Sequence, residues 1–296
     1  MRIISLVPAA TEILADLGAA DQLVGISHEC DYPASVQHLP RVTTTTIEPG
    51  DDSRRIDARL REEGETVVLA AQEIQALKPD LIITQALCEV CAVSEGAVRR
   101  LADAIKPTPE TMALSGRTIA GVTYDILRLG EAVGTYEARE SADRMANRME
   151  ERFLAIRDRA RAQRRGDPAP RVLCIEWLDP VFLAGHWVPE QVEFAGGLDI
   201  GAEPGAHSRQ VTLDELNGFQ FDQMFIIPCG FDVARTRLEL ETQGLMSSWL
   251  RGQQVPIFLM DANSYTSRPG PRLVEGASIM AAALAGGRHE GLQPWG

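Results

Sequence analysis

The sequence has no long hydrophobic run and few basic residues. Nowhere do about 18 apolar residues follow one another, so no membrane-spanning helix is predicted. Only 29 Lys and Arg residues stand against 42 Asp and Glu, which gives a formal net charge of -13. Nucleic acid requires a basic surface and an anionic membrane attracts one, so the composition argues against both kinds of partner.

Targeting signals and common catalytic motifs are also missing. Met1-Arg2 runs directly into strand-forming residues, without the apolar segment and cleavage site of a signal peptide. This predicts a cytoplasmic protein, or a periplasmic one if the N-terminus has been trimmed or misassigned. The sequence contains no Gly-x-Ser-x-Gly, Gly-x-x-x-x-Gly-Lys, Gly-x-Gly-x-x-Gly or His-Glu-x-x-His motif, so the enzymes that these motifs define are not predicted.

Cysteine is scarce. The five cysteines are Cys30, Cys88, Cys91, Cys174 and Cys229. A cytoplasmic location keeps them reduced, and their odd number argues against a complete disulfide framework. With 296 residues, 45% of them hydrophobic, the chain is globular and long enough for one large core or two ordinary ones.

Apolar, strand-forming runs alternate with helical patterns in both halves of the chain. This alternation predicts an α/β fold with two doubly wound lobes and all-parallel sheets. The predicted strands cover residues 3–7, 23–26, 42–47, 81–84, 172–177, 181–184, 224–228 and 256–260. The predicted helices cover residues 11–17, 70–77, 95–105, 189–195, 212–217, 235–249 and 271–285. The charged residues 50–65 predict a surface excursion.

The middle of the chain has a different pattern. Apolar residues recur at helical spacing from residue 118 to about 165, and residues 137–164 are compatible with one unbroken helix of roughly 40 Å. Such a helix is either a long surface helix or a rigid connector. The Pro- and Gly-containing segment that begins at Gly166 marks its end. The predicted division is an N-terminal α/β lobe at 1–116, a helical connector at 117–166 and a C-terminal α/β lobe at 167–296.

Polar side chains that bind metals or protons follow the strands of the first half. His28 and Glu29 come just after the strand at 23–26, and the Cys88-x-x-Cys91 pair comes after the strand at 81–84. Because parallel sheets bind ligands at the carboxyl ends of their strands, His28 and Glu29 are predicted to contact a ligand. The two thiols either bind a soft metal, form a redox disulfide, or are ordinary buried cysteines.

Similar clusters occur in the second half. His186-Trp187 and His207-Ser208 lie in loops or at strand ends, although isolated histidines are more often structural than ligating. The loop after the strand at 256–260 combines acid, amide, hydroxyl and guanidinium groups. Its Arg268 would suit a carboxylate, phosphate or amide oxygen. His38 and His289 have no such context and are predicted to be surface residues.

Five segments resemble periplasmic binding proteins for vitamin B12 and iron siderophores. The segments are Arg2 to Glu12, Gly25-Ile26-Ser27 with Asp31-Tyr32-Pro33, Leu77 to Ile83, Ala195-Gly196-Gly197 and Val211 to Leu216. The resemblance covers nearly the whole chain and implies a monomeric binding protein, not an enzyme. It implies two α/β lobes joined by one long helix, with a ligand cleft between the lobes. It also implies an ABC permease as partner, docked through Asp214 or Glu215.

The resemblance also assigns ligand contacts. Ala9, Phe182, Asp261 and Arg268 match contact positions of the vitamin B12 members, whereas Glu29, Thr45, Gln85 and Ser208 stand where those members have aromatic rings. The cleft is therefore predicted to be more polar, and richer in metal-binding side chains, than a plain corrinoid pocket. The predicted ligand is cobalamin or a related corrinoid, or another metal complex. The predicted contacts are Ala9, Thr11, His28, Glu29, Thr45, Gln85, Phe182, His186, Trp187, Ser208, Asp261, Tyr265 and Arg268, with a possible divalent metal at Cys88 and Cys91.

Two other functions fit the same residues. One is a metal- or thiol-dependent enzyme with Cys88, Cys91, His28 and Glu29 as its reactive centre. The other is a cytoplasmic carrier that hands its metal or cofactor to another protein. Fold alone does not separate these hypotheses. A shared site makes a geometric prediction: Cys88, Glu29, His186 and Asp261 open onto one cavity.

Overall fold

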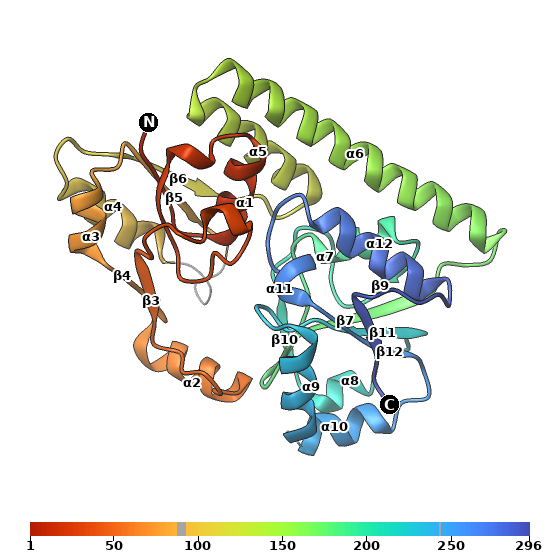
Figure 1. Cartoon of the computed structure of the whole chain (residues 1–296). Coiled ribbons are helices and arrows are strands. Elements are labelled where there is room, and N and C mark those ends of the chain that lie inside the picture. Colours follow the sequence, from red (N-terminus) through yellow and green to blue (C-terminus); the bar gives the residue numbers. More distant parts are fainter. Residues whose placement is uncertain (88–92, 243) are drawn as a thin grey trace. The chain divides into compact units, whose positions relative to one another are not determined.

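The computed structural model describes residues 1–87, 93–242 and 244–296 (Figure 1). They form two compact units. Unit 1 comprises residues 1–51, 55–116 and 120–147, and unit 2 comprises residues 52–54, 117–119 and 148–296. The boundary falls inside the long helix α6 (Tyr136–Arg164), after Asn147.

The sheet of unit 1 has the strand order β2-β1-β5-β6, and all of its pairs are parallel. The strands are β1 (Ile3–Ser5), β2 (Leu23–Ile26), β5 (Leu81–Gln85) and β6 (Glu110–Leu114). The central strands are almost entirely buried, which explains why β1 and β5 read as continuous apolar runs. Sequence patterns predicted β1, β2 and β5, but not the more exposed β6.

A small antiparallel sheet, β3 (Thr43–Thr45) with β4 (Val67–Leu69), accompanies the parallel one. The helices of this part of the chain are α1 (Pro8–Asp16), α2 (Ser53–Glu63), α3 (Ala71–Leu77), α4 (Glu95–Asp103) and α5 (Ile119–Val133), with 3-10 turns at Ala20–Gln22 and Ala34–Val36. Ser94 caps α4 by accepting a hydrogen bond from the Ala97 amide at 3.3 Å.

The surface excursion predicted over residues 50–65 is wrong in part, because it contains the eleven-residue helix α2. Oppositely charged side chains one turn apart stabilise this helix. Arg61 pairs with Asp57 at 2.8 Å, and Arg59 lies 3.8 Å from Glu63. Ile56 supplies a buried contact. Because the segment is highly charged, its helical pattern was not recognised in the sequence.

The long helix α6 confirms the prediction of an unbroken helix. Its 29 residues span about 44 Å at 1.5 Å per residue. Gly134, with a φ of 79°, separates it from α5. Gly130 of α5 allows close packing on α6, because a Cβ at this position would come within 2.6 Å of the Ala142 Cβ.

The sheet of unit 2 is mixed, with the order β10-β8-β7-β11-β12-β13 and β9 paired to β7. Its strands are β7 (Arg171–Leu178), β8 (Val181–Leu183), β9 (Leu198–Asp199), β10 (Arg209–Val211), β11 (Gln223–Ile226), β12 (Ile257–Met260) and β13 (Leu292–Pro294). β8, β10 and β13 pair antiparallel, so the all-parallel prediction is wrong at the edges of this sheet. The turn between β7 and β8 is too short for a parallel crossover.

The helices of unit 2 are α7 (Val188–Phe194), α8 (Leu213–Leu216), α9 (Val233–Thr242), α10 (Gly244–Arg251), α11 (Ala262–Tyr265) and α12 (Leu273–Leu284). The single helix predicted at 235–249 is instead the pair α9 and α10. The core of this unit gathers fully buried side chains of the central strands, among them Leu173, Ile175, Met224, Ile226 and Leu259. This core fixes the strand ends from which the candidate site is built.

Candidate functional site

Unit 2 gathers aromatic rings at the carboxyl ends of β7 and β11. Trp177 and Phe182 are partners across the β7–β8 pair, so their side chains share one face of the sheet, and both are partly exposed. Phe231, in the loop after β11, packs edge-on against Trp177 with 5.4 Å between ring centroids. The Arg235 guanidinium lies over the Phe231 ring, 3.7 Å from its centroid.

The loop after β12 is tied to this aromatic group. The amides of Ala262 and Asn263 both donate to the Phe231 carbonyl at 3.1 Å. Asp261 caps α11 by accepting from the Ser264 amide at 3.0 Å, and Arg268, only 6% exposed, donates to the Asn263 side chain at 2.9 Å. We call Trp177, Phe182, Phe231, Asp261 and Arg268 the unit-2 face.

His186 follows β8 in a strained backbone conformation. Its φ is 55°, in the left-handed region that costs a residue other than glycine about 1–3 kcal/mol. Gly185 precedes it because a Cβ there would lie 2.6 Å from the Ala206 carbonyl oxygen and the Ser208 nitrogen. Burial, then the neighbouring His207 and Arg117, lowers the pKa of His186 to about 4. This histidine is therefore neutral at physiological pH.

Trp187 and Tyr265 have mainly structural contacts. The Trp187 indole is 5% exposed and donates to the Thr266 carbonyl at 2.7 Å, which links the His186 loop to the loop after β12. The Tyr265 carbonyl accepts from the Gln191 side chain at 3.0 Å. Burial, followed by the charge of Asp261, raises the pKa of the Tyr265 hydroxyl.

In unit 1, the polar residues that follow β2 bond mostly to neighbouring residues of the same unit. The His28 amide donates to the Thr43 hydroxyl at 2.9 Å, and the ring Nδ1 lies 2.7 Å from the same oxygen. Burial, then the charge of Arg41, lowers the pKa of His28. The Glu29 side chain is exposed, while Cys30 is fully buried with its sulfur 3.3 Å from the Ser27 hydroxyl.

Thr11 and Ala9 lie in the core of unit 1, at 0% and 1% exposure. The Thr11 hydroxyl donates to the Ser5 hydroxyl at 2.8 Å and lies 3.0 Å from the Cys30 sulfur. The hydroxyl of Thr11 is thus already satisfied by core partners. A ligand contact at either residue stays a prediction.

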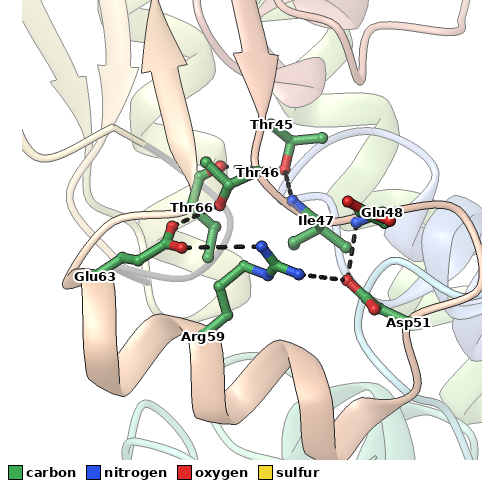
Figure 2. Close-up of polar contacts among 8 residues, drawn as sticks. All are labelled: Thr45, Thr46, Ile47, Glu48, Asp51, Arg59, Glu63 and Thr66. Atoms are coloured by element: carbon green, nitrogen blue, oxygen red, sulfur yellow. Dashed lines mark hydrogen bonds and ion pairs between the residues drawn. The ribbon is translucent and has the colours of Figure 1, made fainter.

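Thr45 stands at the end of β3, in a polar network with α2 (Figure 2). Its hydroxyl donates to the Thr66 carbonyl and accepts from the Ile47 amide, both at 3.1 Å. Figure 2 shows Arg59 reaching between Asp51, at 3.3 Å, and Glu63. This network fixes the chain around Thr45, whose side chain is exposed.

Other predicted residues have separate positions. Gln85 ends β5 and is partly buried, and Ser208 lies in the loop before β10. On α8, the Glu215 carboxylate accepts from the Thr212 amide at 2.7 Å, and this bond lowers the pKa of Glu215. Asp214 is exposed beside it. Permease docking at these two acids stays a prediction.

Cys88 and Cys91 lie outside the described residues. The metal predicted there, the thiol-dependent enzyme and the single cavity shared with Glu29, His186 and Asp261 therefore stay predictions. In the described ranges, no group of three or more His, Cys, Asp and Glu side chains is placed to hold a metal ion.

Three residues of this group, Trp177, Phe231 and Arg235, were not among the ligand contacts predicted from the sequence. Trp177 lies at the end of a predicted strand, so its position at the carboxyl end of that strand could be predicted from the sequence. The contact of Trp177 with Phe231 could not, because it joins two strands that are distant in sequence.

Comparisons with known proteins agree with this fold. The profile of the periplasmic binding protein family matches residues 3–239. No curated protein matches the sequence. Within the described residues, none of the helices is long and apolar enough to cross a membrane.

Three solved structures illustrate the likeness. A periplasmic heme-binding protein from Pseudomonas aeruginosa aligns with a TM-score of 0.72 and 19% identity, over 100% of this chain and 95% of its own. The periplasmic heme-binding protein RhuT from Roseiflexus sp. RS-1 gives 0.68 and 21%, over 96% and 98%. The periplasmic vitamin B12-binding protein BtuF of Vibrio cholerae gives 0.64 and 22%, over 97% and 98%. All three are below 25% identical to this chain, so they show that it shares their fold, and its localisation stays a prediction.

Proposed function

We propose, since the chain belongs to the periplasmic binding protein family, that it is the substrate-binding component of an ABC transporter for a metal tetrapyrrole. The family consists of solute-binding proteins that take small molecules and work with ABC permeases. The resemblance noted in the sequence is thereby confirmed at the level of family. Heme and a corrinoid are the two ligands we consider, with equal weight.

The unit-2 face is the observation that carries this proposal. Trp177 and Phe182 are partly exposed partners across the β7–β8 pair, and the buried Phe231 packs edge-on against Trp177. A large, flat, conjugated ligand gains affinity from such rings through area burial and stacking. The sequence suggested a cleft poor in aromatic rings, because Trp177 and Phe231 were not counted.

Polar groups next to these rings suit the rim of a tetrapyrrole. Heme carries carboxylates at its edge, and corrinoids carry amides. Arg268 donates to carboxylate or amide oxygens, and Asp261 accepts from amide N–H groups. The bonds from the Ala262 and Asn263 amides to the Phe231 carbonyl join the loop that carries Asp261 and Arg268 to the loop that carries Phe231. Related proteins that bind heme or vitamin B12 support the same ligand class.

A melting-temperature screen tests the proposal. The purified full chain is heated with hemin, aquacobinamide, cobalamin, an iron siderophore or a divalent metal salt. A ligand that binds only the folded protein raises its stability by about 2.7 kcal/mol at a hundred times its dissociation constant. We expect at least one tetrapyrrole to raise the melting temperature in proportion to the logarithm of its concentration.

Two results would contradict the proposal. One is a shift with the siderophore alone. The other is a shift with divalent metal alone that is lost in a Cys88→Ser variant, which would favour the thiol-based alternatives. Visible absorbance of the same samples distinguishes heme from corrinoid, because each changes its own spectrum when its environment changes.

A further inference from the structure

Unit 2 contains a cavity of about 400 Å³ away from the unit-2 face. One wall is the C-terminal end of α6, with Ala160, Gln163 and Arg164. The other walls are Pro170, the end of α7 and the end of α12. Pro170 directly precedes β7, and Trp177 lies near the other end of this strand, roughly 23 Å away along an extended chain. The cavity and the unit-2 face therefore belong to opposite ends of β7.

Small aliphatic residues line most of this cavity. The end of α12 contributes Ala281, Leu284 and Ala285, and the end of α7 contributes Ala195 and Gly196. The described residues that line it include no aromatic ring, so a flat conjugated ligand would find nothing to stack on. Its volume lies at the lower end of the range for small-molecule sites, about 300–1,000 Å³. Such walls suit a single flexible aliphatic chain.

The close approach of α7 to α6 depends on Gly196. Its φ is 94°, and a Cβ at this position would lie 2.7 Å from the Cβ of Ala160. The carbonyl of Gly196 accepts a hydrogen bond from Nη1 of Arg164. This bond holds the guanidinium of Arg164 at the wall of the cavity.

The protein uses only part of the Arg164 guanidinium. Its Nε atom is buried and has no hydrogen-bond partner among the described residues. A buried donor without a partner is uncommon, because desolvation without a bond is unfavourable. The two oxygens of a carboxylate fit two neighbouring N–H groups of a guanidinium. Because Gly196 occupies Nη1, the side of the fork formed by Nε and Nη2 remains for such an anion.

Positive charge is concentrated at this end of α6. Residues 157–165 contain five arginines and one acid, Asp158, in a chain with a formal net charge of -13. Cations stabilise the C-terminal end of a helix dipole, which accounts for exposed arginines such as Arg161. The dipole does not account for Arg164, which is partly buried against the cavity. Arg161 is one turn before Arg164, so it adds to the positive field at the cavity.

We propose that this cavity binds a fatty carboxylate, with the aliphatic chain among Ala281, Leu284 and Ala285 and the carboxylate on Arg164. Burial of the chain supplies affinity, and the guanidinium selects an anionic head group over a neutral or cationic one. The inference goes beyond the proposed function, because the described residues that line the cavity include none of the unit-2 face.

A calorimetric titration of the full chain tests the chain and the head group separately. The ligands are decanoate, acetate, which lacks the long chain, and decylammonium, which reverses the charge. The variants are Arg164→Gln, which removes the charge, and Ala285→Phe, which fills the cavity. Ala285 is an exposed residue at the end of α12, so its replacement leaves the core side chains in place.

Two matched controls come from the same helix as Arg164. Arg159→Gln and Ala155→Phe make the same kinds of change at exposed residues of α6 that do not line the cavity. Trp177→Ala removes a ring of the unit-2 face. The melting temperature of each free variant reports whether it folds.

We expect decanoate to bind the wild type saturably, and acetate and decylammonium to bind at least about tenfold more weakly. Arg164→Gln should weaken decanoate binding at least about tenfold, because it removes the charge-assisted bonds. Ala285→Phe should weaken it by a similar factor, because the chain no longer fits. Arg159→Gln, Ala155→Phe and Trp177→Ala should stay within about twofold of the wild type.

Several results would overturn the inference. One is a wild type that does not bind decanoate saturably, and another is wild-type decanoate affinity in folded Arg164→Gln and Ala285→Phe variants. Loss of decanoate binding in Trp177→Ala would place the chain on the unit-2 face instead. Binding to phosphatidylglycerol vesicles without affinity for decanoate would identify a lipid surface as the partner and reject the small-molecule site. Titration of the same preparations with hemin measures the proposed function separately.

Discussion

Units 1 and 2 both place polar or aromatic residues at strand ends, but use them differently. In unit 1, Thr11 and Cys30 bind each other and neighbouring core groups, and His28 is bonded to Thr43. In unit 2, the strand ends carry partly exposed rings, and the His186 Nε2 atom has no partner. Position at a strand end therefore identifies candidates, and local bonding decides which of them remain available to a ligand.

The largest expected effect is on ligand affinity. Replacing Trp177 and Phe182 together by alanine removes two ring contacts worth about 1–1.5 kcal/mol each, so tetrapyrrole affinity should fall roughly 100-fold. Tyr136→Ala, which removes an exposed ring of unit 1, should leave the affinity unchanged. Visible absorbance titrations measure both. An unchanged affinity in the folded double variant would place the ligand elsewhere.

The next effect is on stability, and it tests a residue of unit 2 that lies outside the unit-2 face. Burial raises the pKa of Asp199 to about 6, above its ordinary 3.8. The folded state thus binds the proton more tightly, and stability should fall as pH rises from about 4 to about 6, by roughly 2–3 kcal/mol.

Asp199→Asn cannot ionise and retains an oxygen to accept from the Gly201 and Ala202 amides. Its advantage over wild type in urea unfolding should therefore grow across this pH range and then level off, with ligand affinity unaffected. A difference between the two proteins that is constant with pH would refute this assignment.

A smaller effect on stability tests whether the buried cluster of unit 1 is structural. Thr11→Val keeps the shape of the side chain and removes a hydroxyl bonded to Ser5, so the protein should lose about 1–2 kcal/mol of unfolding free energy. Tetrapyrrole affinity should not change. A tenfold loss of affinity with unaltered stability would instead make Thr11 a ligand contact, as the sequence first indicated.

The smallest effect concerns the network around Thr45. Arg59→Met removes the ion pairs to Asp51, whose side chain is 9% exposed, and to Glu63, whose side chain is 41% exposed. Because the Arg59 side chain is itself 30% exposed, we expect a loss of about 1 kcal/mol. Chemical denaturation should detect a loss of this size, and it should shrink in high salt. A loss above about 2 kcal/mol would show that the network does more than fix the chain locally.

Much of the framework could be predicted because its signals are local. Strands β1, β5, β7, β11 and β12 are apolar runs between turn residues, and the stripe of buried residues in α6 repeats at helical spacing. The antiparallel strands β10 and β13 could not be predicted, since short strands owe their pairing to distant partners. Helix α2 was missed because its charges resembled those of a solvent-exposed loop.

The site was predicted less completely, for a related reason. Phe182, Asp261 and Arg268 were named through resemblance to a family, and the structure ties them to one group of elements. Residue type alone did not reveal that Thr11 is fully buried, or that Trp177 meets Phe231 across the sheet. Both facts depend on contacts between segments that are far apart in the sequence.

Ligand-dependent hydrogen exchange tests the central claim most directly. With a saturating tetrapyrrole, backbone amides in residues 181–187, 229–235 and 261–268 should exchange more slowly, because binding to the unit-2 face stabilises the loops that carry it. Residues 198–202 of the same unit should change little. Saturable binding without protection in the first three segments would contradict the assignment of the unit-2 face as the ligand surface.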